Sequence, residues 1–186
     1  SLSLDPYTRL ARRLAAECIA RQRVSLELKT KTAWIGEMEG LDSRGRVILS
    51  WSVNAQSVSQ REELRAASLD HRFEAAAQAE RWGYRVGFHF DPIVHFSGWE
   101  REYRETIDRI FDTVHPETIA WISLGALRFD PRLKGLVQRR FPSSRFVYGE
   151  FIPGPDGKMR YPESLRVEIF SKMKQWIAGH SARVPV

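Results

Sequence analysis

Short apolar strands in this sequence repeatedly end in polar residues, and an amphipathic helix follows each strand. A strand predicted over Val24–Lys31 ends in a lysine, and one over Arg46–Asn54 ends in Ser52 and Asn54. In β/α folds the loops after the carboxyl ends of parallel strands carry ligands and chemistry. Lys31, Ser52 and Asn54 could hold a carboxylate and a ribose, because a lysine and two short polar side chains suit those groups. The alternative is a polar strand end exposed to water.

The one cluster typical of a metal site is His89, Asp91 and His95, at the end of a strand predicted over Arg85–Asp91. His89 and Asp91 are two residues apart, so they would share one face of that strand. Nitrogen and oxygen ligands suit zinc or iron. We expect no metal here, because His89 could equally pack inward and hydrogen-bond a neighbour. A metal hydrolase built on the three residues is the alternative.

A Pro-Gly-Pro-Asp-Gly segment at residues 153–157 predicts a β-hairpin over about 146–161 with a five-residue loop. The second strand of this hairpin carries Lys158, Arg160 and Tyr161. The two cations could contact phosphates, and the ring could stack on a base. The alternative is a hairpin that only covers the end of the core.

The overall charge fits a polyanionic partner. The chain has a formal net charge of +6 and an isoelectric point of about 9.8. Arg128, shortly after a strand predicted over Ile119–Ser123, joins the hairpin cations as a candidate contact for nucleic acid. A nucleic-acid-binding or interaction domain without catalysis is therefore an alternative to an enzyme. A mildly basic, solvated surface would explain the charge equally well.

Several site types are excluded by what the sequence lacks. It contains no GxGxxG, P-loop or GxSxG pattern. Cys18 is the only cysteine, which excludes an intrachain disulfide or a multi-cysteine cluster within the chain. Tyr7, Leu10, Leu14 and Cys18 share one helical stripe, which predicts that Cys18 lies in the core. No apolar run approaches 18 residues, so we expect no membrane span and a cytoplasmic protein.

Strands that alternate with helices imply right-handed crossovers and a parallel sheet. We predict a single domain over residues 1–186 with the α/β fold class, a partial (β/α) barrel open along one side. The C-terminal hairpin precedes a terminal helix over about 162–179. Four strands are few for a self-sufficient sheet, and the chain opens on Ser1 rather than methionine. We therefore expect a fragment of a longer barrel.

Motifs spread along the chain resemble the spore photoproduct lyase family. The strongest is Gly83–Glu100, which resembles the family's GY-x-x-GF…API…GWE run. The order and spacing agree from about Ser3 to Tyr161. The other matching segments are Thr30-Lys31, Ser52-Val53-Asn54 and Leu127-Arg128-Phe129.

The resemblance implies the C-terminal part of a radical S-adenosylmethionine DNA-repair enzyme, with a TIM-like half barrel. In that family an upstream CxxxCxxC binds a [4Fe–4S] cluster, which reduces S-adenosylmethionine to a deoxyadenosyl radical, and a further cysteine returns hydrogen to the repaired thymine. Cys18 matches none of these, so we expect no catalytic residue in this chain, no bound cofactor and no activity alone. By the same resemblance, Lys31, Ser52 and Asn54 contribute to the S-adenosylmethionine pocket. The partners implied are DNA and the missing N-terminal part of the barrel.

Overall fold

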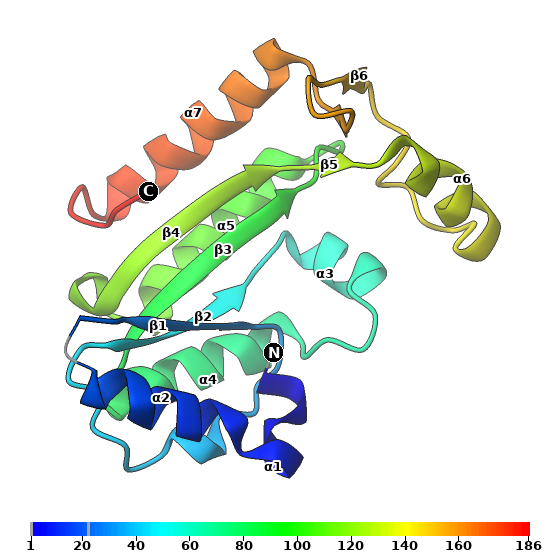
Figure 1. The fold of residues 1–186 in the computed structure, drawn as a ribbon. Coiled ribbons are helices and arrows are strands. Elements are labelled where there is room, and N and C mark those ends of the chain that lie inside the picture. Colours follow the sequence, from blue (N-terminus) through cyan, green and yellow to red (C-terminus); the bar gives the residue numbers. More distant parts are fainter. Residues whose placement is uncertain (1, 22) are drawn as a thin grey trace.

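A parallel four-stranded sheet forms the centre of the computed structural model, which describes residues 2–21 and 23–186 (Figure 1). Its strands, in spatial order, are β1 (Leu26–Thr30), β2 (Val47–Ser52), β3 (Arg85–Ile93) and β4 (Ile119–Ala126). Each strand pairs in parallel with the next one along the chain. The predicted α/β class and parallel sheet are confirmed, and the described strands do not close into a barrel. Ser1, part of the fragment prediction, lies outside the described residues.

Helices precede the sheet, connect its strands and follow it along the chain. Helices α1 (Asp5–Thr8) and α2 (Leu10–Ala20) precede β1, and α3 (Gln56–Glu62) and α4 (Leu69–Arg81) join β2 to β3. Helix α5 (Trp99–Thr113) joins β3 to β4, and α6 (Pro131–Arg140) and α7 (Glu163–His180) follow the sheet. Single 3₁₀ turns occupy Leu2–Leu4, Gly36–Met38 and Pro116–Thr118. No helix of the described residues has the length and apolar character needed to cross a bilayer.

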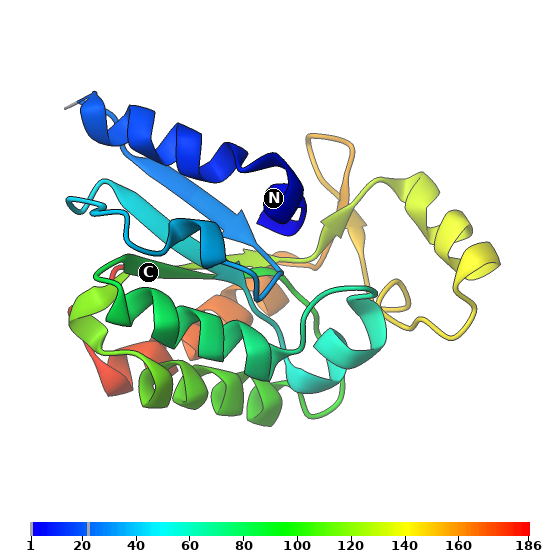
Figure 2. The same ribbon diagram turned by 90° about the horizontal axis from the view of Figure 1, so that it is seen from below.

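One face of the sheet is apolar and packs on α4 and α5, which lie side by side in Figure 2. Its residues alternate along each strand, so Trp51 and Phe88 are register partners on the same face. Phe88 contacts Phe73 of α4, and Phe90 meets Tyr103 of α5 edge-on. Because this core occupies every second position, the intervening side chains of the strands must face the other way.

The N-terminal helices differ from the prediction. Tyr7, Leu10 and Leu14, expected in the core, are 88%, 51% and 45% exposed. The buried face of α2 consists instead of Ala11 and Ala15. Two alanines let the helix approach the sheet closely, and that geometry turns the larger side chains outward. Cys18, on the predicted stripe, is only half-buried.

A second, small antiparallel sheet has the order β5 (Arg128–Phe129), β7 (Met159–Arg160) and β6 (Ile152–Pro153). The pair Pro153 and Met159 closes a hairpin with five residues between them. The first strand is much shorter than predicted, because residues 146–151 are irregular. Val147 is buried there, so that segment packs by its side chains rather than by a ladder of backbone hydrogen bonds.

The two edges of the main sheet differ. The backbone N–H of Ile122 in β4 donates to the carbonyl of Pro185, so the C-terminal residues cover part of that edge. Helix α7 packs near β4 and α5 through Ile169, Met173 and Ile177. At the opposite edge, no described strand pairs with the outer side of β1.

Candidate cofactor and substrate site

The face of the sheet turned away from α4 and α5 is polar. The register places Ser50, Gly87 and Trp121 in one row and Ser52, His89 and Ser123 in the next. Lys29 of β1 is the register partner of Ser50. The same face also carries Glu27, Asp91 and Gly125, from β1, β3 and β4.

Four side chains of this polar face meet above Gly87. Glu27 Oε1 accepts a hydrogen bond from Ser50 Oγ at 2.7 Å and lies 2.5 Å from His89 Nε2. The indole Nε1 of Trp121 lies 3.3 Å from the same His89 nitrogen. A Cβ at Gly87 would stand 3.2 Å from Ser50 Cβ and 3.3 Å from Trp121 Nε1. The absent side chain therefore lets the cluster close over the backbone of β3.

The metal alternative is wrong for the described part of the chain, where no three His, Cys, Asp or Glu side chains are placed to hold an ion. His89 is paired with Glu27, and Asp91 lies 3.9 Å from the Lys29 ammonium. His95 contacts the rings of Trp99 and Tyr161 instead. His89 and Asp91 lie within β3 and face Glu27 and Lys29 of β1, whereas His95 lies beyond the end of the strand. The inward, hydrogen-bonded histidine is the interpretation that the structure supports.

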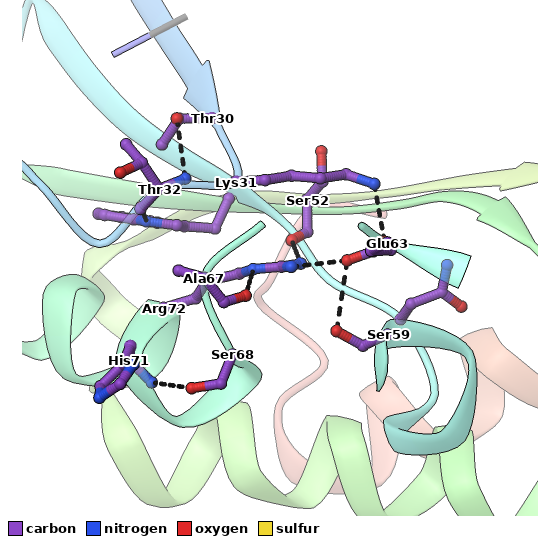
Figure 3. A network of polar contacts seen from close by, with 12 residues as sticks. Thr30, Lys31, Thr32, Ser52, Ser59, Glu63, Ala67, Ser68, His71 and Arg72 are labelled. Carbon is purple, nitrogen blue, oxygen red and sulfur yellow. Dashed lines mark hydrogen bonds and ion pairs between the residues drawn. The ribbon is translucent and has the colours of Figure 1, made fainter. Parts of the chain in front are cut away.

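Lys31 and Ser52 lie together at the carboxyl edge of β1 and β2, within an ion-pair network (Figure 3). Lys31 Nζ is 2.7 Å from Glu63 Oε1, and Arg72 Nη2 is 2.6 Å from Glu63 Oε2. Arg72, which is fully buried, also donates from Nη1 to the Ser52 carbonyl at 2.9 Å. The network ties the ends of both strands to α3 and α4. No local pattern in the sequence pointed to Glu63 or Arg72 as its centre.

Glu63 stays ionised within this network. Burial alone would raise the pKa of its carboxyl group, but the hydrogen bond from Lys31 and the charge of Arg72 bring that pKa below its usual 4.5. Two cations share one carboxylate, so a positive charge remains. The side chain of Lys31 is 39% exposed, so part of it is open to solvent, whereas Ser52 beside it is buried.

Asn54 is placed differently from the expectation. Its side chain is buried, and Nδ2 donates to the carbonyl of Pro92 at 3.0 Å. Its Oδ1 accepts from the Ala55 N–H at 3.0 Å and from the Tyr103 hydroxyl at 2.5 Å. The amide therefore holds the end of β3 against α5. The structure brings Lys31 and Ser52 together and turns Asn54 into the protein.

Arginines gather where the main sheet meets the small one. A cavity of about 350 Å³ is lined by Asp91, Ser123, Arg128, Arg160 and Arg166, among others. Arg128 and Arg160 are register partners in the small sheet. Arg160 also pairs with Asp156, and Arg166 Nε donates to the carbonyl of Tyr161 at 3.2 Å. Arg166 was not among the predicted residues, because α7 approaches this cavity only in the folded chain.

The hairpin residues divide into two kinds. Lys158 is exposed in the loop region, as expected for a phosphate contact. Tyr161 is only 1% exposed, stacks on Phe151 and accepts the backbone N–H of His95 with its hydroxyl at 2.9 Å. The expected stacking of Tyr161 on a base is thus not what the structure offers, because the ring fills the core beneath the small sheet.

A family comparison identifies the chain. The family model for spore photoproduct lyase matches residues 2–152. This chain belongs to the spore photoproduct lyase family. The match spans all four strands of the main sheet and continues through α6 to Ile152, so the resemblance seen in the motifs is confirmed.

Spore photoproduct lyases of known sequence and structure are longer than this chain. It is 25% identical over 131 residues to that of Clostridium acetobutylicum, covering 66% of this chain and 39% of the relative. It is 25% identical over 164 residues to that of a Geobacillus species, covering 82% and 47%. A solved spore photoproduct lyase mutant with bound AdoMet and dinucleoside spore photoproduct matches with a TM-score of 0.89 at 23% identity, over 98% of this chain and 56% of that one. The chain spans less than half the length of these two curated relatives.

Spore photoproduct lyase family membership raises the question of which cofactor groups this chain could hold. A [4Fe–4S] cluster needs three or four cysteine thiolates. The chain has one cysteine, half-buried on α2, so its residues do not fit a cluster. The Lys31 ammonium and the Ser52 hydroxyl, at one strand edge, are of the chemical types that suit the carboxylate and ribose of S-adenosylmethionine.

Proposed function

We propose that this chain forms the C-terminal part of a cytoplasmic radical S-adenosylmethionine enzyme that repairs DNA photolesions. The observation that carries the proposal is the family match over residues 2–152, because those residues build the polar face and its carboxyl edge. The iron–sulfur cluster and S-adenosylmethionine supply the radical chemistry when bound. Since this chain lacks the cluster thiolates, it is inactive alone.

Within this proposal the chain's own residues bind and orient. Lys31 contacts the carboxylate of S-adenosylmethionine, and Ser52 contacts its ribose. Asn54 acts indirectly, because its hydrogen bonds to Pro92 and Tyr103 fix the backbone that follows Ser52. Glu63 holds the Lys31 ammonium at the strand edge.

DNA contacts come from the cations around the arginine-lined cavity. Arg128 and Arg160 line it, and Lys158 lies on the hairpin beside it. Guanidinium groups bind phosphate oxygens well, because their donors form a planar fork. Arg166 belongs to the same set, since it lines the same cavity.

The missing part of the barrel packs on the β1 edge and on the exposed apolar side of the N-terminal helices. This side carries Leu4, Tyr7, Leu10 and Leu14, which are 45% to 88% exposed. An unpaired parallel edge strand accepts a further strand, and an apolar helix side accepts a further helix. Left uncovered, the unpaired strand edge and the exposed apolar helix side would promote aggregation of the protein.

The test uses the longer polypeptide, reconstituted anaerobically with iron and sulfide. We expect it to convert dinucleoside spore photoproduct to thymidines in the presence of S-adenosylmethionine. Lys31→Ala should weaken S-adenosylmethionine binding by about tenfold while the iron content is unchanged. Lys174→Ala, which removes an exposed lysine of α7, serves as the matched control. A cluster-loaded protein without repair activity would refute the lesion assignment.

A nucleic-acid-binding domain without catalysis is the second candidate. The cluster of three arginines at one cavity favours it independently of the cofactor residues. This candidate predicts salt-dependent DNA binding that S-adenosylmethionine does not alter. A change in DNA affinity on adding S-adenosylmethionine to the cluster-loaded protein would exclude it.

A further inference from the structure

The positive charge of this protein is concentrated in one segment. Residues 128–148 contain six Lys or Arg and one Asp, a net charge of +5, whereas the whole chain carries +6. We call this segment, which comprises β5, α6 and the loop that follows, the basic lobe. Figures 1 and 2 both show α6 beyond the carboxyl ends of the strands, away from α2, α4 and α5.

The cations of the basic lobe are exposed and largely uncompensated. Asp130, the N-cap of α6, is paired with Arg132. No carboxylate among the described residues pairs with the other five cations, which are all exposed: Arg128, Lys134, Arg139, Arg140 and Arg145. By contrast, the exposed side of α5 mixes both signs and contains the Arg101–Glu105 pair. A merely solvated surface resembles α5 rather than the basic lobe.

Helix α6 contributes little to the core. Val137 is its only buried residue, and Leu133 is half-buried. The loop after it is attached to α3, where Ser144 Oγ donates to Glu62 Oε2 at 2.6 Å. The lobe is therefore fixed in place while its outward side stays free. A ten-residue helix is about 15 Å long, enough to follow roughly four phosphates of one DNA strand.

We propose that the basic lobe binds the phosphate backbone of double-stranded DNA beside the lesion site. The assignment rests on the proposed function and extends the DNA contact from Arg128, at the arginine-lined cavity, to α6 and the loop that follows it. Backbone contacts by Lys and Arg are independent of sequence, as a repair enzyme that scans DNA requires. The basic lobe exposes two rings, Phe141 and Tyr148, and the Tyr148 ring already lies under the Lys134 ammonium at 5.9 Å. That leaves one ring for stacking, whereas single-strand sites stack successive bases on several.

The experiment titrates a fluorescein-labelled, undamaged 20-base-pair duplex with the full chain between 50 and 200 mM KCl. The test variant combines Lys134→Gln, Arg139→Gln and Arg140→Gln. The control combines Arg13→Gln, Arg104→Gln and Arg183→Gln, which removes the same charge from exposed positions outside the basic lobe. Each lost phosphate contact makes the negative slope of log affinity against log salt shallower by about 0.9. The slope of the test variant should therefore be shallower than that of the wild type by about 2 to 3. The control should keep the wild-type slope, and circular dichroism verifies the fold of both variants.

Equal slopes for the wild type and a folded test variant overturn the proposal. The proposal also fails if the substitutions weaken binding only to a single-stranded oligonucleotide. It fails too if they weaken binding only to poly-glutamate, which would indicate an acidic protein partner instead. Dinucleoside spore photoproduct, offered to the longer cluster-loaded polypeptide, separates the two hypotheses. If the dinucleoside is not bound but the slope difference persists, the basic lobe assignment stands and the lesion-repair assignment fails.

Discussion

Gly87 is the residue on which the polar face depends most directly. Glu27, Ser50, His89 and Trp121 meet above it, and a Cβ at this position would press on Ser50 Cβ and Trp121 Nε1. We expect Gly87→Ala to lower the free energy of unfolding by about 1–3 kcal/mol, because a methyl group would force Ser50 and Trp121 apart. Urea unfolding followed by tryptophan fluorescence measures this effect.

The matched control is Gly179→Ala, near the end of α7, where an added Cβ meets no atom within 4 Å. This substitution should be neutral or stabilising by up to about 1 kcal/mol, because alanine has the higher helix propensity. Equal unfolding midpoints for Gly87→Ala and the wild type would show that the cluster above Gly87 is looser than described.

Tyr103 is the second residue with a specific structural role. Its ring is buried, and its hydroxyl accepts the Val94 N–H at 2.8 Å and donates to Asn54 Oδ1 at 2.5 Å. Burial raises the pKa of this phenol well above its usual range, so the hydroxyl keeps its proton and acts as a donor at neutral pH. Its single hydroxyl therefore fixes both loops that follow β2 and β3.

Tyr103→Phe keeps the ring and removes only this hydroxyl. We expect a loss of about 1–3 kcal/mol in the free energy of unfolding, because the Val94 N–H becomes a buried donor without an acceptor. Chemical denaturation measures the change. Tyr148→Phe, at a half-exposed ring, is the control and should shift stability by no more than about 0.5 kcal/mol. A neutral Tyr103→Phe would show that water replaces the lost contact.

At the scale of elements, one carboxylate joins three segments of the chain. Glu63, at the end of α3, pairs with Lys31 after β1 and with Arg72 of α4. Glu63→Gln should cost about 3–5 kcal/mol, because it leaves the fully buried Arg72 charge without its partner. Glu105→Gln in the exposed pair with Arg101 is the control and should cost about 0.5 kcal/mol or less.

The same carboxylate predicts a pH dependence. The pKa of Glu63 is lower in the folded protein than its usual 4.5, so ionisation favours the folded state. This contribution is fully present above about pH 4.5 and is lost as the pH falls through the lower folded pKa. Thermal unfolding of the wild type between pH 3 and 7 should show that loss, and Glu63→Gln should show a flatter profile. Parallel profiles for the two proteins would contradict the network.

At the scale of the whole molecule, the N-terminal helices expose an apolar side. Leu10 and Leu14 are half-exposed, so Leu10→Ser combined with Leu14→Ser should change the stability of this chain by no more than about 0.5 kcal/mol per site. In the longer polypeptide the same substitutions should cost several times more, if the rest of the barrel packs there. Denaturation of both chain lengths measures the difference. Equal costs in the two would refute the proposed contact.

The amino-acid sequence by itself determined the parallel sheet and the family. These depend on patterns that repeat within ten to twenty residues: apolar strands, helical stripes and the turns between them. The edge that carries Lys31 and Ser52 followed from the same patterns, because parallel strands end together. The hairpin loop was found for the same reason, since proline and glycine specify a turn locally.

Only the tertiary structure decided where the functional side chains point. Lys31 meets Glu63 across 32 positions of sequence, and Tyr161 meets His95 across 66. Such contacts depend on how whole elements pack, and no local period encodes them. Packing on Ala11 and Ala15 turned the leucines of α2 outward, and the end of β3 holds Asn54 inward. The cations of the basic lobe were visible in the sequence, but only the fold showed that they lie on one projecting surface, because α6 has so little core of its own.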